Sequence, residues 1–119
     1  MQRHLRLRRR EDFARLREHG RTWRHPFLVL SATPNDRPHN RYGFITSKHL
    51  GNAVVRNRVR RLLREAVRQA HPHVQPGHDI VLIARKPIVG QTYHTVYKAV
   101  INTLNSAGLM HASPEEPPT

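Results

Sequence analysis

The chain has 119 residues, enough for one compact domain with a single hydrophobic core but too few for two. Its 21 Lys and Arg against 8 Asp and Glu give a formal net charge of +13, which indicates a polyanionic partner, and the prevalence of arginine favours nucleic acid. The absence of cysteine excludes a disulfide framework and a thiol nucleophile, and no apolar run reaches the roughly 20 residues that span a bilayer, so we expect a cytoplasmic protein without a membrane partner.

The N-terminal region is strongly basic. Five of the first ten residues are arginine, a density of like charge that opposes packing, and we interpret residues 1–8 as a mobile basic arm. A short helix is predicted from about residue 9 to 19, because Phe13 and Leu16 share one helical face. Gly20 stands where a left-handed helix C-cap is expected.

Two apolar segments separated by a turn follow this helix. Residues 26–33 and 41–46 are each typical of a strand, and the residues between them are rich in Pro, Asn and Asp. The pattern therefore predicts a hairpin. We add a short strand over residues 22–24 before it, although nothing local demands one.

The clearest helix and the clearest strand lie in the second half of the chain. Asn52 is a good N-cap for a long helical pattern that runs to about Ala70. Residues 78–85 form a compact apolar run, which predicts a buried strand at a central position in the sheet.

A third helix and a polar tail complete the chain. Thr92 can cap a helix whose apolar residues continue at helical spacing to Leu104, with Gly108 past its end. Residues 113–119 contain three prolines and two glutamates, and we expect them to be a disordered tail. The domain is therefore expected over residues 1–112.

The long central helix combines an apolar stripe with a basic ridge. At about 100° per residue, its apolar residues gather on one side and arginines at four-residue steps form a ridge beside them. The ridge consists of Arg56, Arg60, Arg64 and Arg68, and Arg61 extends the basic face. Like charges at this spacing cost a few tenths of a kcal/mol per pair, and only Glu65 offers local neutralisation. The ridge, with Lys48 and His49 in the loop before it, therefore indicates phosphate binding.

The same helix carries a family resemblance. The segment Ala53-Val-Val-Arg56-Asn57-Arg58-Val59-Arg60-Arg61-Leu62-Leu63-Arg64 resembles the Arg-Asn-Arg signature of the bacterial ribonuclease P protein. Further matches occur in the family's order and spacing at Glu11-Asp12-Phe13, His19-Gly20, Ser47-Lys48, Gly51-Asn52-Ala53 and Asp79-Ile-Val-Leu-Ile-Ala-Arg-Lys-Pro87. The resemblance covers about residues 3–109.

The resemblance implies a fold and a function. The implied fold is a single α+β domain with a four-stranded sheet and three helices in the order αβββαβα. It includes a left-handed β–α–β crossover, where general rules predict a right-handed one. The implied function is that of the RNA-binding subunit of ribonuclease P, an endoribonuclease whose catalytic RNA subunit removes the 5′ leader from precursor transfer RNA.

In such a holoenzyme the RNA subunit holds the Mg²⁺ ions and carries out hydrolysis. The resemblance therefore implies no catalytic side chain, no cofactor held by the protein and no obligate protein partner. The expected contacts to the RNA subunit are Arg56, Asn57, Arg58, Arg60, Arg61 and Arg64. The expected leader cleft is the sheet face beside the first helix, with Phe13, Lys48, Arg61 and Arg64 near the leader.

The expected leader cleft departs from the family pattern at two positions. Many family members carry an aromatic residue where this chain has Arg17 and Leu30, so we place both residues in the cleft and expect a thinner stacking platform for bases. From helical spacing with Leu16 alone, however, Phe13 would more often be a core residue than a platform for a ligand.

The sequence gives little support for a metal site or for catalysis by protein side chains. His71, His73 and His78 lack Cys or carboxylate partners at a recognised ligand spacing, so no metal site is predicted. Neither paired carboxylates nor a nucleophile with a base occurs in a shared motif. Two alternatives remain: a DNA-binding regulator, whose helix–turn–helix partner is missing before Gly51, and a ribosomal protein, which should lack the Arg-Asn-Arg signature.

Overall fold

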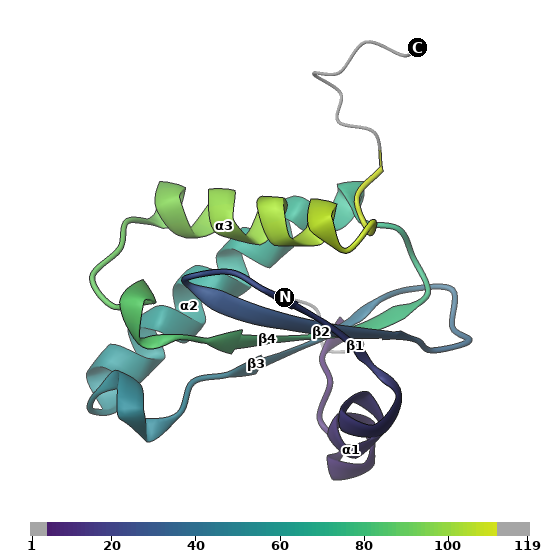
Figure 1. Ribbon diagram of the computed structural model, residues 1–119, viewed down its shortest axis with the longest axis horizontal. Coiled ribbons are helices and arrows are strands. Elements are labelled where there is room, and N and C mark those ends of the chain that lie inside the picture. Colours follow the sequence, from purple (N-terminus) through teal and green to yellow (C-terminus); the bar gives the residue numbers. More distant parts are fainter. Residues whose placement is uncertain (1–4, 112–119) are drawn as a thin grey trace, which may run out of the picture.

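Within residues 5–111, which the computed structural model describes, three α-helices and a four-stranded mixed sheet form one domain (Figure 1). The helices are α1 (Arg10–His19), α2 (Ala53–Ala70) and α3 (Tyr93–Ser106). The strands are β1 (Arg21–Arg24), β2 (Leu28–Pro34), β3 (Arg41–Ile45) and β4 (His78–Ala84). The predicted fold class and the order αβββαβα are confirmed. The predicted tail, residues 113–119, lies outside the described residues.

The strands pair in the order β1-β2-β4-β3. Strand β4 is antiparallel to β2 and parallel to β3, and β1 forms a hairpin with β2. The predicted hairpin between the second and third strands is therefore wrong, because β4 lies between them. The apolar run of β4 is buried on both faces, so it takes the central position that the sequence predicted for it.

The sheet separates a large core from a small one, and Figure 1 shows α3 and α1 on opposite sides of it. Ile80 and Leu82 of β4 belong to the large core with residues of α2 and α3. The intervening Val81 packs instead with Leu7 and Leu16 in the small core. This alternation along the strand gives each face its own packing partners.

The sequence predicted the start of α2 correctly but not the conformation at the end of α1. Asn52 accepts a hydrogen bond from the Val55 amide at 3.0 Å, as expected of an N-cap. Gly20 is not the left-handed cap that the sequence predicted, since its backbone is extended with φ of −73°. A Cβ at this position would lie 2.4 Å from the carbonyl oxygen of Leu16, so the glycine permits a close approach rather than an unusual dihedral angle.

The N-terminal segment was expected to be a mobile arm, but two of its residues, Leu5 and Leu7, pack against the rest of the domain. Leu5 and Leu7 are only 9% and 6% exposed, and the Leu7 amide donates to the carbonyl of Tyr42 at 2.7 Å. The two leucines flank Arg6, which is half-buried, and Arg8 after them is exposed. Residues 1–4 of the predicted arm lie outside the described residues.

An ionic network ties α1 to the sheet. The fully buried carboxylate of Asp79 accepts hydrogen bonds from Arg41 at 2.9 and 2.8 Å, from Asn35 at 3.0 Å and from Arg15 of α1. Arg41 also pairs with Asp12 of α1 at 3.1 Å. Burial alone would raise the pKa of Asp79, but the hydrogen bonds from Arg41 and Asn35 and the charge of Arg41 outweigh it and hold that pKa below its ordinary value.

Candidate nucleic-acid interface

Helix α2 is capped at its start and linked to the sheet just past its end. Its first turn is capped by Asn52, and just past its last turn the Nδ1 atom of His71 lies 2.7 Å from the hydroxyl of Tyr42 on β3. Burial raises the pKa of Tyr42 to about 12, so the hydroxyl stays protonated at neutral pH. The basic face of α2 is therefore held in a defined orientation.

That orientation buries the predicted apolar stripe and leaves the arginines outside. The buried residues of α2 are Val59, Leu63, Ala66, Val67 and Ala70. Asn57, Arg58, Arg61 and Arg68 are exposed, and Arg56, Arg60 and Arg64 are half-buried beside the stripe. The two faces lie as the sequence predicted.

Most of this positive charge is not compensated within the protein. Arg68 forms two hydrogen bonds to the carboxylate of Glu65, which lower the pKa of that glutamate. Arg60 donates to neutral oxygens of Asn57 at 3.0 Å and Thr46 at 2.5 Å. Among the described residues, no carboxylate lies within ion-pair distance of the other five arginines, Arg56, Arg58, Arg60, Arg61 and Arg64.

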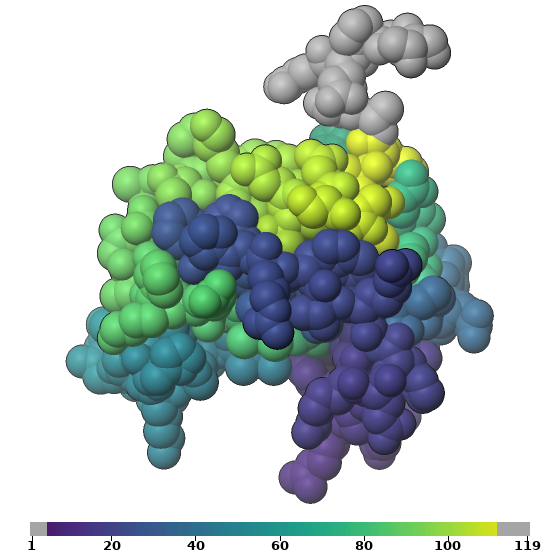
Figure 2. Space-filling view, in the orientation of Figure 1, coloured from purple at the N-terminus to yellow at the C-terminus, as the bar shows by residue number. Residues whose placement is uncertain are grey.

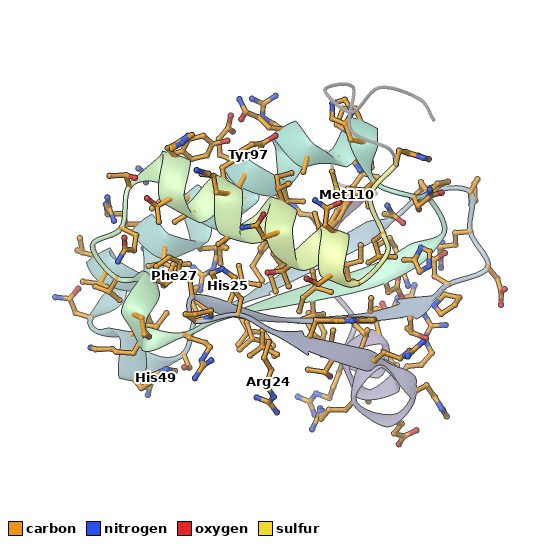
Figure 3. All side chains as sticks on the ribbon, turned by 45° about the horizontal axis from the view of Figure 1, so that its top comes forward. Arg24, His25, Phe27, His49, Tyr97 and Met110 are labelled. Carbon is orange, nitrogen blue, oxygen red and sulfur yellow. The ribbon has the colours of Figure 1, made fainter. Side chains whose placement is uncertain are left out.

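The loop before α2 adds further cations. Lys48 and His49 are exposed in a short 3₁₀ helix, η2 (Lys48–Leu50), and Figure 3 shows His49 at the end of the molecule away from α1. The ammonium group of Lys86 donates to the backbone carbonyls of His49 and Leu50, both at 3.2 Å. The sequence analysis missed Lys86, although its place directly after the central strand next to Arg85 was a usable signal.

A hollow lies on the other face of the sheet, beside α1. It is lined by Phe13, Leu16, Arg17, Thr22, Ser31, Ile45, Val81 and Ile83. Figure 2 shows the surface recessed between α1, in purple, and the teal segment that contains η2. Ile45 is 37% exposed although it is apolar, so the floor of the hollow offers an uncovered hydrophobic surface.

The structure places the predicted cleft residues in three different environments. Phe13 and Arg17 line the hollow. Lys48, Arg61 and Arg64 do not belong to its lining, and η2 with Lys48 follows three residues after Ile45. Leu30 was placed in the cleft wrongly: it is 0% exposed in the large core, on the face covered by α2 and α3.

The misplacement of Leu30 has a simple geometric cause. In the β1–β2 pairing, Thr22 faces Ser31 and Trp23 faces Leu30. Because side chains alternate along a strand, Thr22 and Ser31 line the hollow and Leu30 points the other way.

Phe13 both packs in the core and lines the hollow, the two roles that the sequence analysis considered for it. Its ring packs on the small core of Leu7, Leu16 and Val81, yet it remains partly exposed and lines the hollow. A Cβ at position 43 would lie 2.9 Å from two carbons of the ring, so Gly43 makes room for the ring on β3.

Neither a metal site nor a membrane-spanning helix is found within residues 5–111. No group of three or more His, Cys, Asp or Glu side chains in residues 5–111 is arranged to hold a metal ion. In the same part of the chain, no helix is long and apolar enough to cross a membrane.

The chain is similar to ribonuclease P proteins in sequence and in fold. The family model "Ribonuclease P" matches residues 1–108. The ribonuclease P protein component of Roseiflexus sp. (strain RS-1) is 46% identical over 114 residues, which cover 95% of this chain and 93% of the relative. That of Herpetosiphon aurantiacus is 43% identical over 93% of this chain and 90% of the relative.

Solved structures give the same result. The ribonuclease P protein of Staphylococcus aureus superposes with a TM-score of 0.83 at 30% identity, covering 90% of this chain and 98% of that one. For the protein of Thermotoga maritima the TM-score is 0.79 at 28% identity, with 85% and 96% covered. Since sequence and fold agree over nearly the whole length, the chain belongs to the ribonuclease P protein component family.

Proposed function

We propose that this chain binds the catalytic RNA subunit of ribonuclease P through α2 and η2, and the 5′ leader of precursor transfer RNA in the hollow beside α1. The observation that carries the proposal is the uncompensated charge of α2, where five arginines lack a carboxylate partner among the described residues. Uncompensated guanidinium groups are suited to contacts with the phosphates of an RNA backbone.

The two surfaces lie on different parts of the molecule, which suits binding of two RNA segments at once. The basic face of α2 offers charge for phosphates, whereas the hollow offers Phe13, an apolar floor and Arg17 at its rim. Single-stranded RNA is commonly bound by such a combination of an aromatic platform and nearby cations. The leader, which is unpaired, therefore suits the hollow.

In this proposal the protein takes no chemical part in hydrolysis. The RNA subunit holds the Mg²⁺ ions, and the arginines reduce the repulsion between two polyanions that Mg²⁺ would otherwise have to screen. The complex needs no other protein partner. The cysteine-free chain needs no oxidising compartment, which suits work in the cytoplasm.

The variant Phe13→Ala tests the leader site in the reconstituted holoenzyme. We expect it to weaken binding of precursor transfer RNA by about 1–3 kcal/mol, the usual value of one base-stacking contact. Binding of mature transfer RNA, which has no leader, should stay near the wild-type value. Equilibrium titrations of both RNAs measure the difference.

Phe27→Ala is the matched control, because Phe27 is also partly buried but packs against the large core. It should leave the ratio of the two affinities unchanged. Thermal unfolding of both variants separates a loss of packing from a loss of contact with RNA. Equal weakening of both RNAs by Phe13→Ala would remove the hollow from the proposed function.

A further inference from the structure

The docked N-terminal segment brings an additional arginine to the basic face of α2. Strand β3 is the outermost strand beside β4, and the segment adds to its open edge through a parallel bridge between Arg6 and Tyr42. Leu5 packs into the large core and Leu7 into the small one. The backbone at Arg6 is therefore held from both sides.

Arg6 lies in a hollow together with Arg60 and Arg64 of α2. The floor of this hollow is formed by Leu7 and by residues 42–44 of β3. Arg60 is held in place by its hydrogen bonds to Asn57 and Thr46. Three guanidinium groups thus converge from two elements that are far apart in sequence.

Within residues 5–111, no counterion faces the charge in this hollow. Burial lowers the pKa of Arg64, and the positive charges of Arg6 and Arg60 lower it further. The Nε atom of Arg6 is buried and has no hydrogen-bond partner among the described residues. In the same part of the chain, no carboxylate lies within ion-pair distance of these three arginines.

A neighbouring basic hollow does contain a carboxylate. Arg6 lines it too, with Arg8, Arg9 and Arg37, but so do Asp12 and Arg41, which form an ion pair. The hollow without a carboxylate in its lining is the one that Arg6 shares with Arg60 and Arg64.

We propose that Arg6, Arg60 and Arg64 bind one phosphate group of an RNA backbone, and that docking of the N-terminal segment completes this site. The inference rests on the proposed function, since the phosphate belongs to the RNA subunit that α2 binds. Because the anion favours the state in which Arg6 is docked, binding of the RNA and docking of the segment stabilise each other.

A double-mutant cycle on the affinity for the RNA subunit tests the shared phosphate. Arg6→Ala and Arg64→Ala should each weaken binding about tenfold, and each should reduce the slope of log affinity against log salt by about one. The double variant should lose clearly less than the product of the two losses, because both side chains contact the same group. Arg10→Ala, an exposed arginine that lines none of these hollows, is the matched control and should bind nearly as the wild type does.

Docking is followed by hydrogen exchange of the Leu7 amide, which donates to Tyr42. The RNA subunit should slow this exchange in the wild type and in Arg6→Lys, and clearly less in Arg64→Ala. Inorganic phosphate is the second probe. The proposal would be overturned if phosphate slowed hydrogen exchange of the Leu7 amide while Arg6→Ala left the affinity for RNA unchanged. Free phosphate would then be the ligand.

Failure of the shared phosphate site and failure of the proposed function give different results. Multiplicative losses, or an Arg6→Ala affinity equal to that of Arg10→Ala, would overturn the shared site while the wild type still binds RNA. Absence of salt-dependent RNA binding by the wild type would overturn the proposed function itself. Thermal unfolding of Arg6→Ala near the wild-type midpoint shows that a loss of affinity is not a loss of fold.

Discussion

Replacing Asp79 by Asn is expected to lower the free energy of unfolding by about 3–5 kcal/mol, the usual cost of removing one partner from a buried ion pair. The carboxylate is 0% exposed and accepts hydrogen bonds from two arginines, so the neutral amide leaves Arg41 with a buried and poorly matched partner. The small core under α1 contains only three buried residues among those described, which gives little compensation. Urea titration of the protein alone measures the effect.

Asp36→Asn is the control for this prediction. Asp36 is exposed in a turn with φ of +57°, a conformation that Asp and Asn both tolerate, so its replacement should change the stability by less than about 0.5 kcal/mol. If the two variants were equally stable, the ionic network would not hold α1 on the sheet.

The difference in the free energy of unfolding between the wild type and Asp79→Asn should also depend on pH. Because its pKa in the folded protein is below the ordinary value, the carboxylate contributes stability above its unfolded pKa of about 3.9. This contribution is lost as the pH falls through the folded pKa. The gap between wild type and Asp79→Asn should therefore be constant near neutral pH and shrink below about pH 4.

Replacing Lys48, Arg58 and Arg61 together by Ala is expected to weaken binding of the RNA subunit about 10²- to 10³-fold, at roughly 1–1.5 kcal/mol per lost contact with a phosphate. All three side chains are exposed, and none is in an ion pair among the described residues, so the fold should be unaffected. The slope of log affinity against log salt should fall by about three. Titrations at several salt concentrations give both quantities.

A second triple variant has the same change in charge at a different place. Arg21 and Arg24 lie on β1 and Lys98 on α3, all three exposed, and Figure 3 shows Arg24 pointing away from the sheet. Their replacement by Ala should lower the affinity much less than the first triple variant does. Equal losses would mean that RNA binding depends on net charge alone and not on the surface formed by α2 and η2.

The features that the sequence predicted correctly are those with local signals. The faces of α2 follow from helical periodicity between Arg56 and Ala70, and the cap at Asn52 follows from residue type at one position. The central place of β4 follows from an apolar run on both faces. None of these conclusions requires knowing which other helix or strand the element packs against.

Apart from the cap at Gly20, the errors concern residues whose position depends on a distant part of the chain. Leu30 and Ser31 differ by one position, and only the register with β1 and β4 determines which of them faces the hollow. The packing of Leu5 and Leu7 was not predicted, because the edge of β3 beside which they lie is formed by residues far along the chain. The site of Arg6, Arg60 and Arg64 could not be predicted for the same reason.

In the proposed function, this protein assists a catalytic RNA by binding RNA and does not cut RNA itself. The most direct test of this function is cleavage of precursor transfer RNA at low Mg²⁺ by the protein, by the RNA subunit and by both together. We expect cleavage only in the mixture, because the arginines replace part of the screening that Mg²⁺ supplies at higher concentration. Cleavage by the protein after all RNA has been removed from it, or a mixture no more active than the RNA subunit alone, would contradict the account.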